Sequence, residues 1–140
     1  MVELIIGNKG KGKTKVLLNR AETDLKNSTG NIIFVDKDLK HMHGLDYKIR
    51  LVDMSDYDVD TTEEFMGFVN GIISQNNDIE EIILDSYLSI AFIDTDDGMV
   101  SSIERINDIS EKFGVRFLLS ISRDKEHLPD VLSDMVVEAL

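Results

Sequence analysis

Apolar and polar positions follow two rhythms along this chain. Continuous apolar runs are typical of short strands buried on both faces, whereas apolar residues that return every three or four positions are typical of amphipathic helices. The runs predict strands at Val2–Ile6, Asn31–Asp36, Glu81–Asp85, Val115–Ser122 and Asp134–Leu140, with a more polar edge strand at Tyr47–Val52.

Three helices are expected between these strands. The first runs from Lys13 to about Lys26. Thr61 and Glu64 form a capping box that opens the second, whose inward face carries Phe65, Phe68, Val69, Ile72 and Ile73. The third follows a solvated acidic loop at Asp94–Gly98 that caps it, ends at Gly114, and points Val100, Ile103, Ile106 and Phe113 inward. Alternating strands and helices predict one α/β domain over residues 1–140, doubly wound in three layers around a mainly parallel sheet of about six strands.

A glycine-rich loop joins the first strand to the first helix and fits G-x-x-x-x-G-K-[ST], the phosphate-binding pattern called Walker A. Its glycines let the backbone turn its N–H groups toward phosphate oxygens, and the helix N-terminus adds partial positive charge. Lys13 is expected to contact the outer phosphates, and Thr14 is expected to bind magnesium. The predicted nucleotide-binding residues are Gly7, Asn8, Lys9, Gly10, Lys11, Gly12, Lys13, Thr14 and Lys15.

Asp85 follows the apolar run Ile82–Leu84 and gives it the form of a Walker B strand. Ligands of open α/β sheets bind at the carboxyl ends of the strands. The carboxylate is therefore expected to hold magnesium opposite Thr14, since magnesium prefers oxygen ligands. The alternative is an ordinary turn residue, because aspartate often follows a strand in that role.

The order of these elements resembles the RecA-like ATPase core, a branch of the P-loop nucleoside triphosphatases that includes recombinases, KaiC-type clock ATPases and hexameric helicases. The likeness spans nearly the whole chain as element order, but only the phosphate loop is specific as sequence. It implies that strand 115–122 lies between the loop strand and the Walker B strand. It also implies that this strand ends in a residue that senses the γ-phosphate, either Ser120, Ser122 or Arg123.

The same resemblance bears on the catalytic carboxylate. Many related ATPases have a glutamate directly after the Walker B aspartate, where this chain has Ser86. The RecA branch has its base at the end of the strand after the first helix, which implies Asp38, or its neighbour Asp36, as the residue that orients the attacking water. Solvated turn residues are an equally good interpretation of this pair. Arg123 is expected either to reach a γ-phosphate, in its own site or a neighbour's, or to form an ordinary surface pair.

Charge and composition narrow the function classes. The net charge is −12, yet residues 1–20 hold five basic residues and one acidic residue, while the rest holds 10 basic and 26 acidic residues. Positive charge therefore gathers at the loop, and nucleic acid is not an expected partner. The chain has no cysteine, no signal-peptide pattern and no apolar run long enough to span a bilayer, so a cytoplasmic protein without a membrane span is expected. His41 and His43 are interpreted as a solvated turn rather than a metal site.

These observations predict a Mg²⁺-dependent ATP-binding protein that hydrolyses ATP slowly. A second copy of the chain or another protein is expected to complete its site. ATP is the default nucleotide, because Asn8 and Lys9 lie inside the loop and do not form a guanine-reading motif. Two alternatives remain: an ATP-binding switch or adaptor with little hydrolysis, and a small phosphoryl transferase.

Overall fold

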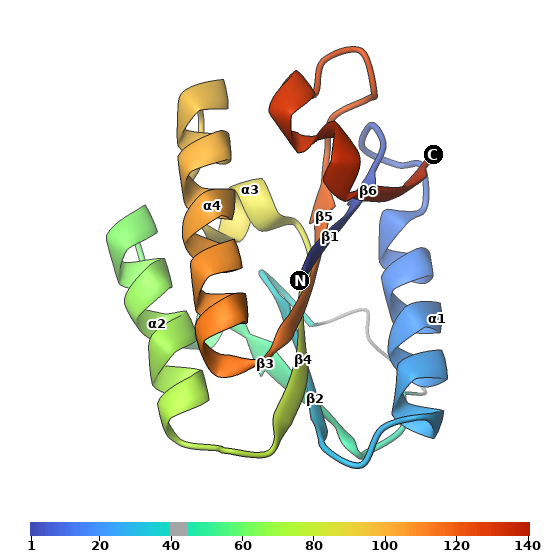
Figure 1. Ribbon diagram of the computed structural model, residues 1–140, viewed down its shortest axis with the longest axis vertical. Coiled ribbons are helices and arrows are strands. Elements are labelled where there is room, and N and C mark those ends of the chain that lie inside the picture. The colour runs from blue at the N-terminus through green and yellow to red at the C-terminus, as the bar shows by residue number, and fades with distance from the viewer. Residues whose placement is uncertain (40–44) are drawn as a thin grey trace.

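The computed structural model describes residues 1–39 and 45–140 (Figure 1). His41 and His43 lie outside the described residues. The strands are β1 (Val2–Ile6), β2 (Asn31–Asp36), β3 (Ile49–Asp53), β4 (Ile79–Leu84), β5 (Arg116–Ile121) and β6 (Val136–Ala139). The helices are α1 (Lys13–Lys26), α2 (Thr62–Ser74), α3 (Tyr87–Ile90) and α4 (Asp96–Phe113), with two 3₁₀ turns, η1 (Met54–Asp56) and η2 (Asp130–Met135).

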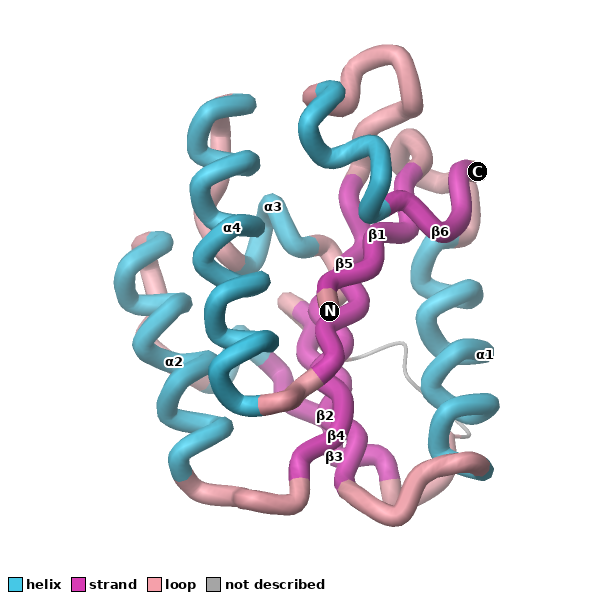
Figure 2. Tube along the Cα trace, viewed as in Figure 1, coloured by secondary structure: helices cyan, strands magenta, loops and turns pink. Residues whose placement is uncertain are grey.

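All six strands pair in parallel in one sheet, in the order β3-β2-β4-β5-β1-β6. The helix α1 covers one face, and α2, α3 and α4 lie on the other (Figures 1 and 2). The predicted α/β class with a parallel sheet is confirmed, as is the edge position of β3. The strand β5 lies between β1 and β4, as the resemblance implied.

The core explains why the strands read as continuous apolar runs. Side chains along a strand alternate between the two faces, and both faces here are covered. In β2, Ile32 and Phe34 pack beneath α1, while Ile33 and Val35 join the larger core beneath α2 and α4. The other central strands divide in the same way, so helices on both faces bury nearly every position of β1, β2, β4 and β5.

The capping residues predicted from the sequence mark the starts of α2 and α4 and the end of α4, but one prediction at a helix end is wrong. Thr61 and Thr95 cap α2 and α4, and Gly114 ends α4 in the left-handed region with φ of 67°. Phe113 was expected to face inward but is 47% exposed, because the helix ends there and the chain turns toward β5. Between β4 and α4 the chain also forms the short helix α3, which was not predicted from the sequence.

Candidate functional site

The glycine-rich loop adopts backbone conformations that only glycine takes readily. Gly10 and Gly12 have φ values of 86° and 93°, in the left-handed region where a side chain would be strained. Gly12 is the residue that caps α1, and as a glycine it has no side chain that could accept a hydrogen bond from the first turn of this helix. The first-turn amides are thus left for another acceptor, as at anion-binding helix N-termini.

Lys13 and Thr14 begin α1 beside this loop. Lys13 is buried, and its Nζ donates a hydrogen bond to the carbonyl oxygen of Asn8 at 3.2 Å, so the ammonium group lies back over the loop. Burial lowers the pKa of Lys13, and the nearby Asp85 carboxylate opposes that effect. The Oγ1 of Thr14 donates to Oδ2 of Asp85 at 2.7 Å. The two predicted magnesium ligands are therefore adjacent.

The register of the sheet brings further polar residues to the same place. Val35 pairs with Leu84, and Leu84 pairs with Leu119, so Asp36, Asp85 and Ser120 follow one another across the carboxyl edge. All three lie on the face covered by α1, because the strand alternation continues past the apolar residues. The Oγ of Ser120 donates to Oδ1 of Asp85 at 2.5 Å, which fixes the carboxylate from the side opposite Thr14.

Asp36 and Asp85 form a pair of neighbouring acids with different environments. Burial, followed by the charge of Asp85, raises the pKa of Asp36 to about 7. Its Oδ1 accepts a hydrogen bond from the backbone N–H of Lys37 at 2.7 Å, which partly offsets that rise. Near neutral pH, Asp36 is therefore divided between a neutral acid and a carboxylate, a state that suits proton transfer.

A cavity of about 360 Å³ lies at this edge of the sheet. Its lining combines residues of the loop and α1 with polar residues that follow β4 and β5. These are Lys9, Gly10, Gly12, Lys13, Thr14, Asp85, Ser86, Ser120 and Ser122. The structure thus brings together most of the sequence-predicted site, including both predicted magnesium ligands and two of the three sensor candidates.

The remaining predicted residues lie outside this lining. Asp36 is buried beside Asp85, and Asp38 is half-buried after the end of β2. Arg123 points to the start of α4, where its Nη1 is 2.8 Å from Oδ1 of Asp96. This ion pair joins the segment after β5 to the first turn of α4.

The donor set at Thr14 and Asp85 fits a magnesium ion. It offers one hydroxyl and one carboxylate, and magnesium in nucleotide sites takes few protein oxygens and keeps waters and phosphates as further ligands. Within residues 1–39 and 45–140, no three histidine, aspartate or glutamate side chains cluster as an all-protein metal site.

Sequence reasoning missed two polar residues near the site, Lys37 and Ser89. They line a smaller hollow beside the cavity together with Ser86 and Ser122. Lys37 was not predicted to lie near the site because the predictions for its segment concerned the neighbouring acids, Asp36 and Asp38. Ser89 was not predicted because α3 was not. One signal in the sequence pointed to Lys37, namely its predicted position at the carboxyl end of a strand, where α/β sheets bind ligands.

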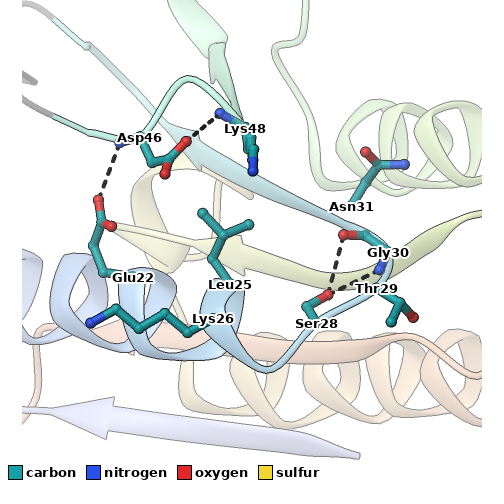
Figure 3. Close-up of a pocket in the computed structure, with 9 residues that line it drawn as sticks. All are labelled: Glu22, Leu25, Lys26, Ser28, Thr29, Gly30, Asn31, Asp46 and Lys48. Carbon is teal, nitrogen blue, oxygen red and sulfur yellow. Dashed lines mark hydrogen bonds between the residues drawn. The ribbon is translucent and has the colours of Figure 1, made fainter.

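A larger hollow, about 630 Å³, lies at the other end of α1 (Figure 3). Its polar groups bond to one another: Glu22 accepts from the backbone N–H of Asp46 at 3.2 Å, and Asp46 accepts from that of Lys48 at 2.9 Å. It is at the amino ends of the strands, away from the edge where α/β sheets bind ligands. Size therefore does not identify the site here.

Comparison with known proteins adds no family to these observations. No protein family model matches the chain, and no curated protein matches it in sequence. Among the described residues, none of the helices has the length and apolar character required to cross a bilayer.

Proposed function

We propose that this chain is a minimal P-loop nucleotide-binding protein of the RecA-like kind that binds Mg·ATP and hydrolyses it slowly. The observation that carries the proposal is the 2.7 Å contact between Thr14 and Asp85, near the buried residue Lys13. These residues come from separate elements, and their convergence beside a loop of left-handed glycines supports a phosphate and magnesium site.

Each residue has a chemical role in this proposal. The amides of residues 9–15 and the Lys13 ammonium bind the phosphates, while Thr14 and Asp85 hold the metal. Bound magnesium neutralises charge on the phosphate oxygens. Ser120 and the N–H of Ser86 keep the Asp85 carboxylate in one orientation, with hydrogen bonds of 2.5 and 3.0 Å.

Slow hydrolysis follows from the position of the base. Asp36 is buried beside Asp85 and does not line the cavity, so an attacking water in the cavity is not in direct reach of its carboxylate. Ser86 stands where many related enzymes carry a glutamate. Asp38 remains the second candidate for the base, and Ser122 and Arg123 remain candidates for γ-phosphate sensing.

A second function, a switch that binds Mg·ATP with little hydrolysis, is favoured by the same observation on Asp36. A partner or a second copy of the chain would then supply the missing group, as would also be needed for fast turnover. Binding is common to both functions, and phosphate release separates them.

Titration calorimetry with Mg·ATP tests the proposal. Wild type and Lys26→Ala, a variant in the last turn of the same helix, should bind one nucleotide with similar affinity. Lys13→Ala should lose roughly 100-fold in affinity, about 2.7 kcal/mol, while its circular dichroism spectrum stays that of wild type. No uptake by wild type, or equal uptake by Lys13→Ala, would refute the proposal. Phosphate release that Lys13→Ala abolishes identifies an ATPase, and binding without release identifies a switch.

A further inference from the structure

A second, smaller cavity of about 230 Å³ adjoins the proposed phosphate site. It lies among the ends of β2, β4 and β5 and the start of α3. Its lining residues are Lys9, Lys37, Ser86, Leu88, Ser89 and Ser122. Lys9, Ser86 and Ser122 also line the cavity beside Thr14 and Asp85, so the two hollows share a wall.

The chemistry of this lining favours an anion. Two of its six residues are lysines, three are serines and none is an acid. This is unusual in a chain with a net charge of −12. Ammonium and hydroxyl groups donate hydrogen bonds to phosphate oxygens, and such bonds to a charged acceptor are the stronger kind.

The shared wall is built on a constrained turn. Ser86 is not glycine but has φ of 57° and ψ of 48°, a conformation that costs energy and that the surroundings must impose. Its N–H donates to Oγ of Ser120 at 2.8 Å and to Oδ1 of Asp85 at 3.0 Å. Tyr87, next along the chain, is fully buried. Ser86 is therefore held firmly between the two cavities.

The volume limits the size of the ligand. Sites for drug-sized molecules occupy about 300–1,000 Å³, so a cavity of about 230 Å³ suits a single phosphate group with little attached to it. We propose that this cavity binds a second anion, the phosphate group of a small molecule or inorganic phosphate, beside the γ-phosphate end of the bound nucleotide. This inference rests on the proposed function, since it takes the nucleotide site as its neighbour.

Inorganic phosphate is the probe for the test. Protein saturated with Mg²⁺ and the non-hydrolysable analogue AMPPNP is titrated with phosphate by calorimetry. Because the analogue fills the γ-phosphate position, one further phosphate should bind only if the second cavity is a separate site. Lys37→Ala should weaken this binding at least tenfold and leave AMPPNP affinity within about threefold of wild type. The matched control is Lys112→Ala, at the far end of α4, which should bind phosphate as wild type does.

Two results would overturn the inference. In one, phosphate binds to the Mg·ADP form but not to the AMPPNP form, which shows that the cavity only receives the nucleotide's own γ-phosphate. In the other, Lys37→Ala binds phosphate as tightly as Lys112→Ala does. Failure of the proposed function is a different result, the absence of AMPPNP uptake by the wild type. In that event, phosphate binding to nucleotide-free protein should still depend on Lys37, and its independence of Lys37 would refute the anion cavity as well.

Discussion

The N-termini of α1 and α4 differ in what lies near the unpaired backbone N–H groups of their first turns. Both leave the first backbone N–H groups without partners inside the helix, at the positive end of the helix dipole. In α4, Oγ1 of Thr95 accepts from the N–H of Gly98 at 2.9 Å, and Asp96 and Asp97 place negative charge in the first turn. In α1, the cap is a left-handed glycine, and the first turn holds Lys13 and Lys15 with no acid.

This difference bears on whether each helix start requires a ligand. At the start of α4, the side chain of Thr95 and the first-turn acids supply the acceptor and the negative charge from within the chain. The start of α1 has basic residues in its first turn with no acid and no side-chain cap, an arrangement that under the proposed function favours an external anion. The sequence around α2 repeats the self-satisfied design, with Thr61 accepting from the N–H of Glu64 at 3.1 Å. Its second half differs from the usual capping box, because Glu64 accepts from the N–H of Asp60 instead of that of Thr61.

Among the substitutions that test this difference between helix starts, Gly12→Ala should change nucleotide affinity the most. A side chain at φ of 93° is strained whatever space surrounds it, so the loop must change shape and its amides leave the phosphates. We expect Mg·ATP affinity to fall roughly 100-fold and the free energy of unfolding to fall by about 1–2 kcal/mol. Calorimetry and urea unfolding measure the two quantities.

Gly67→Ala is the matched control, because Gly67 lies inside α2 and an added Cβ would meet open space. Alanine there should stabilise the protein by about 1 kcal/mol and leave nucleotide affinity unchanged. An unchanged affinity in Gly12→Ala would show that the left-handed turn of the loop serves the fold alone.

Asp85→Asn should have the next largest effect. Asparagine keeps the shape of the side chain and can still accept from Ser120, but it loses the charge that holds magnesium. Magnesium raises ATP affinity by a certain factor in wild type, and we expect this factor to be at least tenfold smaller in the variant. The corresponding loss of binding free energy is about 1.4 kcal/mol or more. The measurement is ATP affinity as a function of magnesium concentration. A wild-type magnesium dependence in this variant would show that Asp85 is a turn residue only.

Asp36→Asn tests the acid pair by its pH dependence. The pKa of Asp36 is raised from 3.8 to about 7 in the folded protein, so the stability that its neutral form contributes is complete below pH 4 and is lost as the pH rises toward 7. Asparagine does not ionise. We therefore expect the variant to gain about 2 kcal/mol over wild type between pH 5 and pH 8, measured by urea unfolding.

Glu81 also has a raised pKa, but it does not affect the difference in stability between wild type and Asp36→Asn. Its pKa is raised to about 8, first by burial and then by Asp24, and it is present in both proteins. It lies near the amino end of β4, away from Asp36. A constant difference between wild type and Asp36→Asn across this pH range would show that Asp36 is ionised throughout.

The sequence revealed most of this architecture because its signals are local. Each central strand is a continuous apolar run, and each capped helix begins with a threonine followed by acids. The Walker A pattern located the loop, and the apolar run before Asp85 located the second half of the site. Both depend on spacing along the chain and not on distant contacts.

The parts that sequence reasoning did not predict depend on tertiary neighbours. Ser86 is held in a left-handed turn by Ser120 and Asp85, which are brought together by sheet register. The pairing of Arg123 with Asp96 joins the segment after β5 to the first turn of α4, 27 residues away in the sequence. Lys37 lines a cavity with Ser89 because the fold brings α3 beside the end of β2. No local pattern encodes these contacts.

Thr95→Ala gives the smallest expected effect and the cleanest test of the contrast between the two helix starts. Removing the hydroxyl leaves the N–H of Gly98 without its acceptor, so the free energy of unfolding should fall by about 1 kcal/mol. Thr61→Ala, which removes the corresponding cap from α2, should lose a similar amount. At 100 times its dissociation constant, Mg·ATP should add about 2.7 kcal/mol to wild type and to both variants alike, because neither cap contacts the proposed site. A cap variant that also lost more than about threefold in Mg·ATP affinity would show that the start of that helix takes part in binding. Ligand binding would then no longer distinguish the start of α1 from the starts of α2 and α4.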